Sequence, residues 1–244
     1  MNNFIENVKA NALFAAEFLL IAIAIFLAAL ALEKLADRKN GVRERTLSTQ
    51  KMTMTAMFSA IALILHLLDF PLPFLAPDFY KLDFSELPAL VGAFAFGPVV
   101  GVLIEAVKIL LKLMIKGTST AFVGDLANFV IGCSFILPAS VIYYFKKSKK
   151  SALAGCVIGT LILTLFGTAF NAVYLLPAFS RLYGMPLESI LALGAKINPL
   201  VNGESIISFV ACCVAPLNLI KGGSVSLVTM LIYKPLSPII KARR

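Results

Sequence analysis

The sequence predicts an all-α integral membrane protein with a core of six helices and one additional helix at the N-terminus. Apolar residues make up 59% of the 244 residues, only 14% are charged, and the mean hydropathy is +0.91. Apolar windows long enough to cross about 30 Å of hydrocarbon recur along the whole chain. The period-2 alternation that a membrane β-barrel requires is absent. A soluble domain of this size would carry far more polar residues.

Basic residues gather in three short stretches between the apolar segments, and their placement predicts how the helices are oriented. Loops rich in Lys and Arg face the cytoplasm, so we expect the loops near 69–87, 116–125 and 177–203 to face outward. The same pattern places the C-terminus in the cytoplasm and the N-terminus outside. The net charge of +9 then reflects topology rather than nucleic-acid binding. The three stretches contain Lys34, Arg38, Lys39, Arg43, Arg45 and Lys51; Lys146, Lys147, Lys149 and Lys150; and Lys234, Lys241, Arg243 and Arg244.

The first apolar segment, residues 12–32, is expected to be a retained membrane helix. It is long for the apolar region of a signal peptide, and no small-residue cleavage site follows it. A signal anchor is the alternative. We therefore divide the chain into residues 1–50, an added N-terminal transmembrane helix with a basic cytoplasmic linker, and residues 51–244, a six-helix membrane domain.

The first three core helices are bounded by proline and glycine. The first is expected at about Met52–Leu68, because three prolines in the following DFPLPFLAPD prevent its continuation. The second covers about Pro88–Phe96, Gly97-Pro98 makes a break, and the third runs over about Val99–Ile115. Together the second and third hold too few residues for two full spans, so we expect them to be short or tilted.

The segment YKLDFSELP, residues 80–88, precedes the second core helix and has two interpretations. Ser85 is expected to cap the helix, with Pro88 in its first turn. Alternatively the segment forms a lid, in which apolar side chains such as that of Leu82 cover a ligand that enters from outside.

The last three core helices follow at about Leu126–Phe145, at about Ser151–Leu176 and across residues 200–234. Asp125 is a candidate N-cap for the first of these. Residues 200–234 are too many for one span, so we expect part of 203–216 to form an outer helical segment before the last crossing. Cys133, Cys156, Cys212 and Cys213 lie within apolar segments and are interpreted as core residues.

Charged and amide side chains inside the apolar segments are the candidates for a binding site. Lys221 is the only charged residue between Ser205 and Ile232, and a lysine at mid-membrane costs roughly 2.5–3.5 kcal/mol on insertion scales. It lies one helical turn after Asn218. The pair suggests a polar clamp for a ligand, and the alternative is a lysine that reaches back to the lipid headgroups. Asn171 either bonds a neighbouring helix or meets Asn218 and Lys221 around a shared cavity.

Glu105, Lys108 and Lys112 form a charged stripe on the third core helix. Their spacing favours an internal structural ion pair over a transport or proton-relay role. Catalytic and metal sites are not predicted: the chain lacks a P-loop motif and an H-E-x-x-H motif, and His66 is its single histidine. An intramembrane enzyme that uses Asp125, Glu105 or Lys108 is a remote alternative.

Five segments occur in the order KLDFSELPAL, FGPVVGVLIEAVK, VGDLANFVIGCSFILPAS, NAVYLLPAF and PLNLIKG. In this order they resemble the substrate-binding (S) component of energy-coupling-factor (ECF) vitamin transporters, specifically the riboflavin type. The resemblance covers about residues 51–240. The N-terminal helix and the insertion AKINPLVNGES lie outside the usual pattern, and Pro216-Leu217-Asn218 stands where the family has PFN.

The resemblance implies a six-helix fold that binds riboflavin, its transported ligand, under the loop after the first core helix, without a cofactor. By motif match, Asn171, Asn218 and Lys221 hydrogen-bond the flavin ring, and Leu82 belongs to the covering loop. Ala56 and Ala60 match the small-residue patch that contacts the coupling protein. The implied partners are a transmembrane coupling protein (T component) and two cytoplasmic ATPases, in a bacterial cytoplasmic membrane. The alternatives are FMN or another heteroaromatic vitamin as cargo, and a stand-alone ion-coupled carrier.

Overall fold

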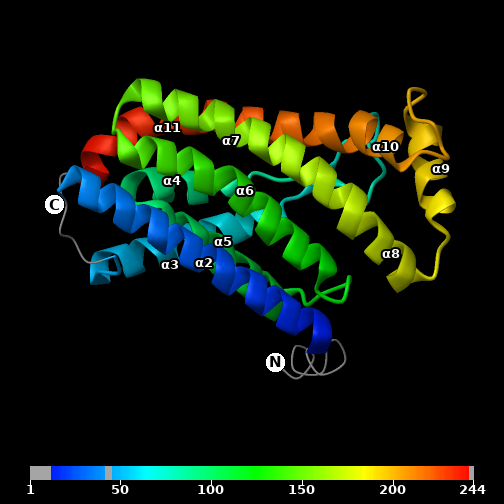
Figure 1. The fold of residues 1–244 in the computed structure, drawn as a ribbon, viewed down its shortest axis with the longest axis horizontal. Helices are drawn as coiled ribbons and strands as arrows, with labels where there is room; N and C mark the ends of the chain where they lie inside the picture. Colours follow the sequence, from blue (N-terminus) through cyan, green and yellow to red (C-terminus); the bar gives the residue numbers. More distant parts are fainter. Residues whose placement is uncertain (1–11, 42–45, 242–244) are drawn as a thin grey trace.

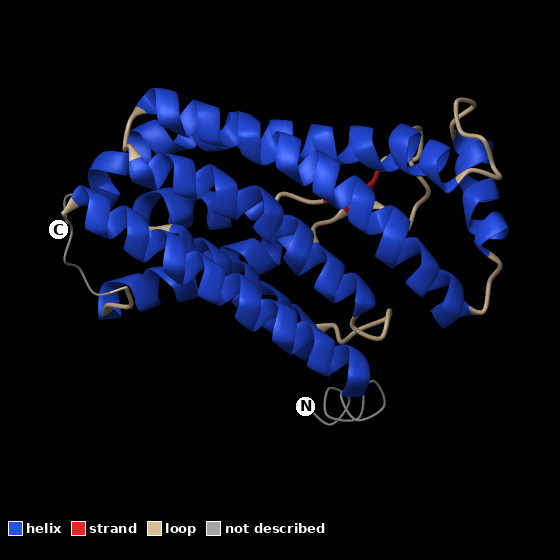
Figure 2. Ribbon diagram, in the orientation of Figure 1, coloured by secondary structure: helices blue, strands red, loops and turns tan. Residues whose placement is uncertain are grey.

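Nearly all of the described chain is helical, and the long helices lie side by side along one axis (Figures 1 and 2). The computed structural model describes residues 12–41 and 46–241. Two short strands, β1 (Phe70–Pro71) and β2 (Lys81–Leu82), pair antiparallel between the first two core helices. The helical elements are α2 (Ala12–Asn40), α3 (Thr49–Leu67), α4 (Glu86–Phe96), α5 (Pro98–Ile115), α6 (Val123–Phe145), α7 (Lys149–Phe170), η1 (Asn171–Leu175), α8 (Leu176–Tyr183), α9 (Leu187–Ile197), α10 (Ile206–Phe209), η2 (Val210–Val214) and α11 (Ala215–Lys241).

The helix lengths confirm the predicted membrane fold. In the described chain, four segments are long and apolar enough to span a membrane: Phe14–Asn40, Val123–Phe145, Lys149–Tyr183 and Ile206–Tyr233. With 11 and 18 residues, α4 and α5 are about 17 and 27 Å long at 1.5 Å per residue. Both are short for a membrane of about 30 Å, as predicted. The turn between α6 and α7 lies at one end of the bundle and α9 lies at the other (Figure 1).

The break between α4 and α5 occurs at Gly97, as predicted, and a side chain of α2 caps the start of α5. Gly97 has φ of +114°, a conformation that favours glycine. The next free N–H of α5, that of Val99, donates to Glu33 Oε2 of α2 at 2.9 Å. Glu33 is buried, and its other oxygen lies 3.7 Å from Lys51 Nζ. The added helix α2, which packs against α5 and α6, therefore supplies an N-terminal cap to a core helix.

The predicted side-chain caps at Ser85 and Asp125 are wrong, although α4 begins directly after Ser85 and has Pro88 in its first turn, as predicted. Ser85 has helical backbone angles and makes no side-chain capping bond; its Oγ accepts a hydrogen bond from Lys108 Nζ at 2.9 Å. The helix α6 begins at Val123, and Asp125 pairs with Lys112 at 2.6 Å. At Ser85 the buried ammonium group of Lys108 takes the oxygen, because an unpaired charge in an apolar interior costs more than an uncapped N–H. Asp125 is not an N-cap because α6 begins two residues before it.

The prediction of a separate helical segment in part of 203–216 is wrong, and a short helix, α9, lies instead within the predicted loop 177–203. Residues 206–241 form one continuous helical run that includes η2. The buried face of α9, with Ile190 and Leu191, packs on Phe209 and Val210 of that run. An amphipathic helix therefore covers the start of the last crossing helix.

Some predictions concern residues outside the described ranges. These are the outward N-terminus and the charges of Arg43, Arg45, Arg243 and Arg244.

Candidate functional site

A small cavity lies beneath the segment that joins α3 to α4. We call residues 69–85 the lid and this space the inner cavity. It has a volume of about 170 Å³. Its polar lining includes Tyr80 of the lid, Glu86 of α4, Asn171 of η1, and Asn218 and Lys221 of α11. The structure thus brings Asn171, Asn218 and Lys221 to one cavity, although up to 50 residues of sequence separate them.

Two prolines shape the helices that carry the asparagines. η1 begins at Asn171 and ends two residues before Pro177, and η2 ends two residues before Pro216. Proline lacks an N–H, and its ring clashes with the carbonyl four residues earlier. The helix accommodates this by widening into a π turn, a feature that often marks functional sites. Asn171 therefore lies at the start of one widened turn, and Asn218 lies four residues after the other.

Lys221 is held by two carboxylates. Its Nζ lies 2.7 Å from Glu86 Oε1 and 3.3 Å from Asp83 Oδ2, and the residue is only 9% exposed. The alternative that Lys221 extends to lipid headgroups is therefore wrong. Asp83 Oδ1 also accepts the N–H of Ser85 at 2.8 Å. Burial raises the pKa of the Asp83 carboxyl, but the Lys221 ammonium and His66 more than offset this and hold that pKa well below its usual value.

The two asparagines differ in their bonding. Asn171 Oδ1 accepts a hydrogen bond from Tyr80 Oη at 2.8 Å, and its Nδ2 donates to the Gly167 carbonyl at 2.7 Å. Asn218 Nδ2 is buried and has no hydrogen-bond partner among the described residues. Gly167 makes room for it, because a Cβ there would lie 2.8 Å from this nitrogen. The lid therefore bonds the amide of Asn171, whereas the amide of Asn218 has a donor without a partner among the described residues.

Leu82 is buried, with 3% of its surface exposed, but it does not line the inner cavity. It lies on β2, where it pairs with Phe70 of β1. The lid residues that do line the cavity are its neighbours Phe79, Tyr80 and Lys81. Leu82 thus contributes to the lid's own packing, and the aromatic rings beside it face the space.

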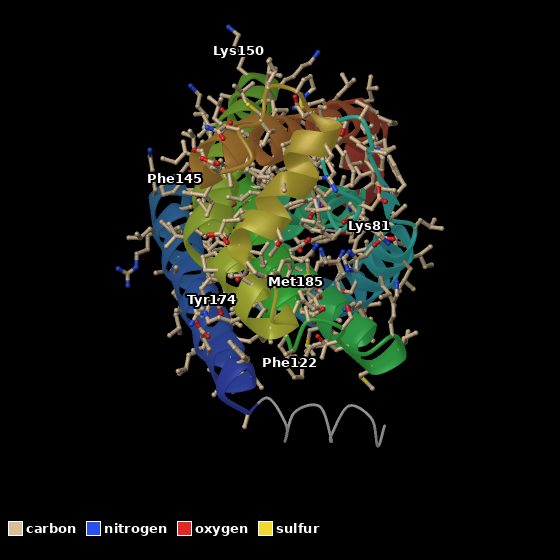
Figure 3. The ribbon with its side chains drawn as sticks, turned by 90° about the vertical axis from the view of Figure 1, so that its right-hand side faces the viewer. Lys81, Phe122, Phe145, Lys150, Tyr174 and Met185 are labelled. Carbon is tan, nitrogen blue, oxygen red and sulfur yellow. The ribbon has the colours of Figure 1, made fainter. Side chains whose placement is uncertain are left out.

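A larger hollow, the outer cavity, adjoins the inner one and has a volume of about 680 Å³. The two share five lining residues: Phe79, Lys81, Gly124, Asn128 and Phe179. The outer cavity is also lined by Met185 and by three hydroxyl or cationic side chains near the α5–α6 turn, Lys116, Ser119 and Thr120. Figure 3 looks onto this end of the bundle, where Lys81 and Met185 are labelled. A ligand that reaches the inner cavity can therefore extend into a wider vestibule with both polar and apolar walls.

The charged stripe on α5 divides into two ion pairs. Glu105 Oε2 and Lys108 Nζ lie 2.6 Å apart and are fully buried, so the predicted internal ion pair is present. Lys112 instead pairs with Asp125 of α6 and lines the outer cavity. The described residues contain no group of His, Cys, Asp and Glu side chains that could hold a metal ion.

Sequence reasoning missed Tyr80, Asp83 and Glu86 as members of the site. All three lie in the segment YKLDFSELP, which was interpreted as a helix start or a lid. The signal was the lone lysine of the last helix, because a buried ammonium requires a carboxylate partner. The sequence does not say which carboxylate it is, since Asp83 lies 138 residues away.

Ala56 and Ala60 are both exposed on one face of α3. α2 packs on α5 and α6, on a different part of the bundle. The added helix thus leaves this small-residue face open.

Comparison with known proteins gives one consistent family. The family described as "ECF transporter, substrate-specific component" matches residues 50–233. The riboflavin transporter RibU of Staphylococcus aureus (strain TCH60) is 36% identical over 83% of this chain and 98% of the relative. The riboflavin transporter FmnP of Bacillus subtilis (strain 168) is 33% identical over 81% of this chain and 97% of the relative. A solved structure of the S component of a bacterial ECF transporter matches with a TM-score of 0.61 and 36% identity, over 79% of this chain and 98% of that one.

Proposed function

The chain belongs to the family of ECF transporter substrate-specific components, and from this premise we propose that it is the riboflavin-binding subunit of such a transporter. The family is a transporter component and not an enzyme family. The proposed role is to bind the vitamin at the outer face and release it unchanged on the inner side. Two relatives that carry the name riboflavin transporter support this cargo.

The single observation that carries the proposal is the meeting of Lys221, Asn218 and Asn171 at one cavity beneath a lid. The pyrimidine edge of riboflavin has two carbonyls and one N–H. An ammonium and two amides are groups that complement it. We propose that these side chains hold the edge of the ring, and that Leu82 stabilises the lid that covers it.

The size of the two cavities supports a ligand that occupies both. At about 170 Å³ the inner cavity is smaller than most ligand pockets, which have about 300–1,000 Å³. The outer cavity adds about 680 Å³. We propose that the flat ring enters the inner cavity edge first and that the ribityl chain lies in the outer one, near Asn128 and Thr120. Phe79 and Phe179, which line both spaces, provide aromatic walls.

The proposed partners follow from what the chain lacks and from what its surface offers. It has no P-loop motif, so ATP hydrolysis would come from two cytoplasmic ATPases through a transmembrane coupling protein. We propose Ala56 and Ala60 as the contact for the coupling protein, because small residues four apart let another helix approach closely. In this proposal residues 51–244 are the substrate-binding unit, residues 1–50 are an addition to it, the C-terminus is cytoplasmic, and the cavities open outward.

FMN is a second candidate cargo, and one observation favours it. The outer cavity carries three ammonium groups, those of Lys81, Lys112 and Lys116. Two of them are paired with carboxylates, Lys81 with Asp69 and Lys112 with Asp125. A phosphate on the ribityl chain would lie in this vestibule rather than beside Lys221.

Titration of riboflavin against the purified protein tests the proposal. We expect micromolar or lower protein to quench flavin fluorescence saturably, with a flavin identified by mass spectrometry in the protein as isolated. Competition by FMN separates the two cargoes. Absence of quenching at micromolar flavin, with no flavin in the isolated protein, would contradict both.

A further inference from the structure

Glu86 lines the inner cavity and has a carboxylate oxygen without a hydrogen-bond partner among the described residues. It is the first residue of α4, is 2% exposed and lines the cavity. One carboxylate oxygen, Oε1, lies 2.7 Å from Lys221 Nζ. The other, Oε2, is buried and has no hydrogen-bond partner among the described residues. A buried carboxylate oxygen without a donor is unfavourable, so the site is suited to a ligand that brings one.

Donors that need acceptors lie in the same cavity. Lys221 carries three N–H donors, of which Glu86 and Asp83 take two. Asn218 Nδ2 has no partner. The residues that line the cavity therefore combine one acceptor without a partner, Glu86 Oε2, with donors from Lys221 and Asn218. An imide edge, –CO–NH–CO–, has the opposite pattern, with one donor between two acceptors.

We infer that Glu86 is a specificity-determining residue that accepts a hydrogen bond from the ring N–H of an imide-bearing heteroaromatic ligand. Lys221 and Asn218 donate to the carbonyls on either side. This inference rests on the proposed function and refines it, because the pyrimidine ring of a flavin has such an edge, with its N–H at N3. The role differs from that of Asp83, whose two oxygens already meet Ser85, Lys221 and His66.

One other unpartnered acceptor borders the cavity. Asn128 Oδ1 also has no partner among the described residues. Asn128 is only partly buried and lines the outer cavity as well. Glu86 is the acceptor that is charged, fully buried and bonded to Lys221. It is therefore the one placed to bond the same ring edge as the lysine, and Asn128 provides a matched comparison.

The experiment compares riboflavin with N3-methylriboflavin, which lacks the ring N–H, by fluorescence titration of the full-length protein in detergent. A hydrogen bond to a charged acceptor predicts about 10- to 100-fold weaker binding of the methylated flavin to the wild type. In Glu86→Ala, riboflavin binds more weakly and the ratio of the two dissociation constants falls to within about threefold of one. Asp83→Asn and Asn128→Ala are controls: either one weakens binding of both flavins equally and leaves the ratio as in the wild type.

Several outcomes would overturn the inference. Equal binding of the two flavins to the wild type does so alone, while riboflavin binding still supports the proposed function. If the ratio of the two dissociation constants stays high in Glu86→Ala, or falls to about one in Asn128→Ala, a group other than Glu86 accepts the ring N–H. If Glu86→Ala does not fold, Glu86→Gln replaces it: its neutral carbonyl is a weaker acceptor, so the ratio must fall, and an unchanged ratio contradicts the role. Failure of the wild type to bind riboflavin removes the proposed function and this inference together.

Discussion

Lys221→Met tests the site most directly, because it removes one ammonium group and keeps a side chain of similar length. In the structure this group lies 2.7 Å from Glu86 and 3.3 Å from Asp83, in an interior where all three residues are less than 10% exposed. The substitution leaves two carboxylates without their shared cation. It also removes a donor from the proposed flavin clamp.

The two effects have separate magnitudes. Breaking a buried ion pair by removing one partner costs about 3–5 kcal/mol of folding stability. We expect a loss of stability at the lower end of this range, since the adjoining cavities can admit water to the two carboxylates that have lost their cation. Loss of a hydrogen bond from a charged donor costs about 1.5–3 kcal/mol of binding free energy, or about 10- to 150-fold in the dissociation constant of riboflavin.

Both effects are measurable on the purified protein. Thermal unfolding can be followed with a thiol-reactive dye, because Cys133, Cys156 and Cys213 are buried in the fold, and affinity by flavin fluorescence. The double variant Lys221→Met/Glu86→Gln removes one stranded charge, so it should recover part of the stability and none of the affinity. A Lys221→Met protein with wild-type melting temperature and wild-type affinity would refute the reasoning.

The same substitution should shift acid unfolding. Lys221 and His66 overcome the effect of burial and hold the folded-state pKa of Asp83 well below its unfolded value of about 3.9. A depressed pKa contributes stability that is fully present above the unfolded value and is lost as pH falls through the folded value. In Lys221→Met the largest of the interactions that oppose burial is lost, so the folded pKa of Asp83 rises. The acid midpoint, followed by far-UV circular dichroism, should therefore move to higher pH, and an unchanged midpoint would contradict this account.

Three further substitutions separate the lid, the amides and the partner surface. Tyr80→Phe removes the bond from the lid to Asn171, at a cost of about 1 kcal/mol in stability; because a ligand that bonds Asn171 no longer has to displace this bond, we expect riboflavin to bind several-fold more tightly in fluorescence titration, and unchanged affinity would show that the ligand does not compete with Tyr80 for Asn171. Gly167→Ala places a Cβ 2.8 Å from Asn218 Nδ2, which should displace the amide and weaken binding about tenfold in fluorescence titration, whereas wild-type affinity would exclude Asn218 from the clamp. Ala60→Phe, on the exposed face of α3, should leave flavin affinity unchanged and reduce co-purification with the coupling protein; full assembly would place the contact elsewhere.

The membrane helices were predictable because the signals for them are local. An apolar run and a following proline or glycine are properties of neighbouring residues. The third core helix was expected at 99–115 and forms at Pro98–Ile115. The short helix α9 was missed, although Ile190, Leu191 and Gly194 have the spacing of one helical face. With 11 residues it is too short to span a membrane, so its apolar residues do not stand out as a predicted span.

The polar contacts of the site were less predictable, since they depend on which helices meet. The sequence required a partner for Lys221, but Asp83 and Glu86 become its neighbours only when α4 packs against α11. The error at Ser85 has the same origin. Capping is a local rule, and it gives way when a buried ammonium from another helix needs the same oxygen.

The π turns were partly predictable, because their position depends on neighbouring residues and their form depends on packing. Each precedes a proline by two residues, and the effect of proline on the preceding turn is a local rule. Pro177 and Pro216 therefore indicate, from the sequence alone, where the two helices are disturbed. The sequence did not reveal that the helix would widen rather than end, because that choice depends on packing against the neighbouring helices.

The lid is bonded to two of the groups proposed to bind the ligand, and this determines where net affinity can arise. Tyr80 occupies Asn171, and Asp83 occupies Lys221. A ligand that bonds Asn171, or that takes the Lys221 N–H directed at Asp83, must therefore compete with the lid, so much of that bond energy replaces an existing contact. A ligand changes an equilibrium only through the difference between what it gains and what it displaces. Glu86 Oε2 and Asn218 Nδ2 have no partner to lose among the described residues. The largest net gain should therefore come from these two atoms, even though Lys221 is the more conspicuous residue of the sequence.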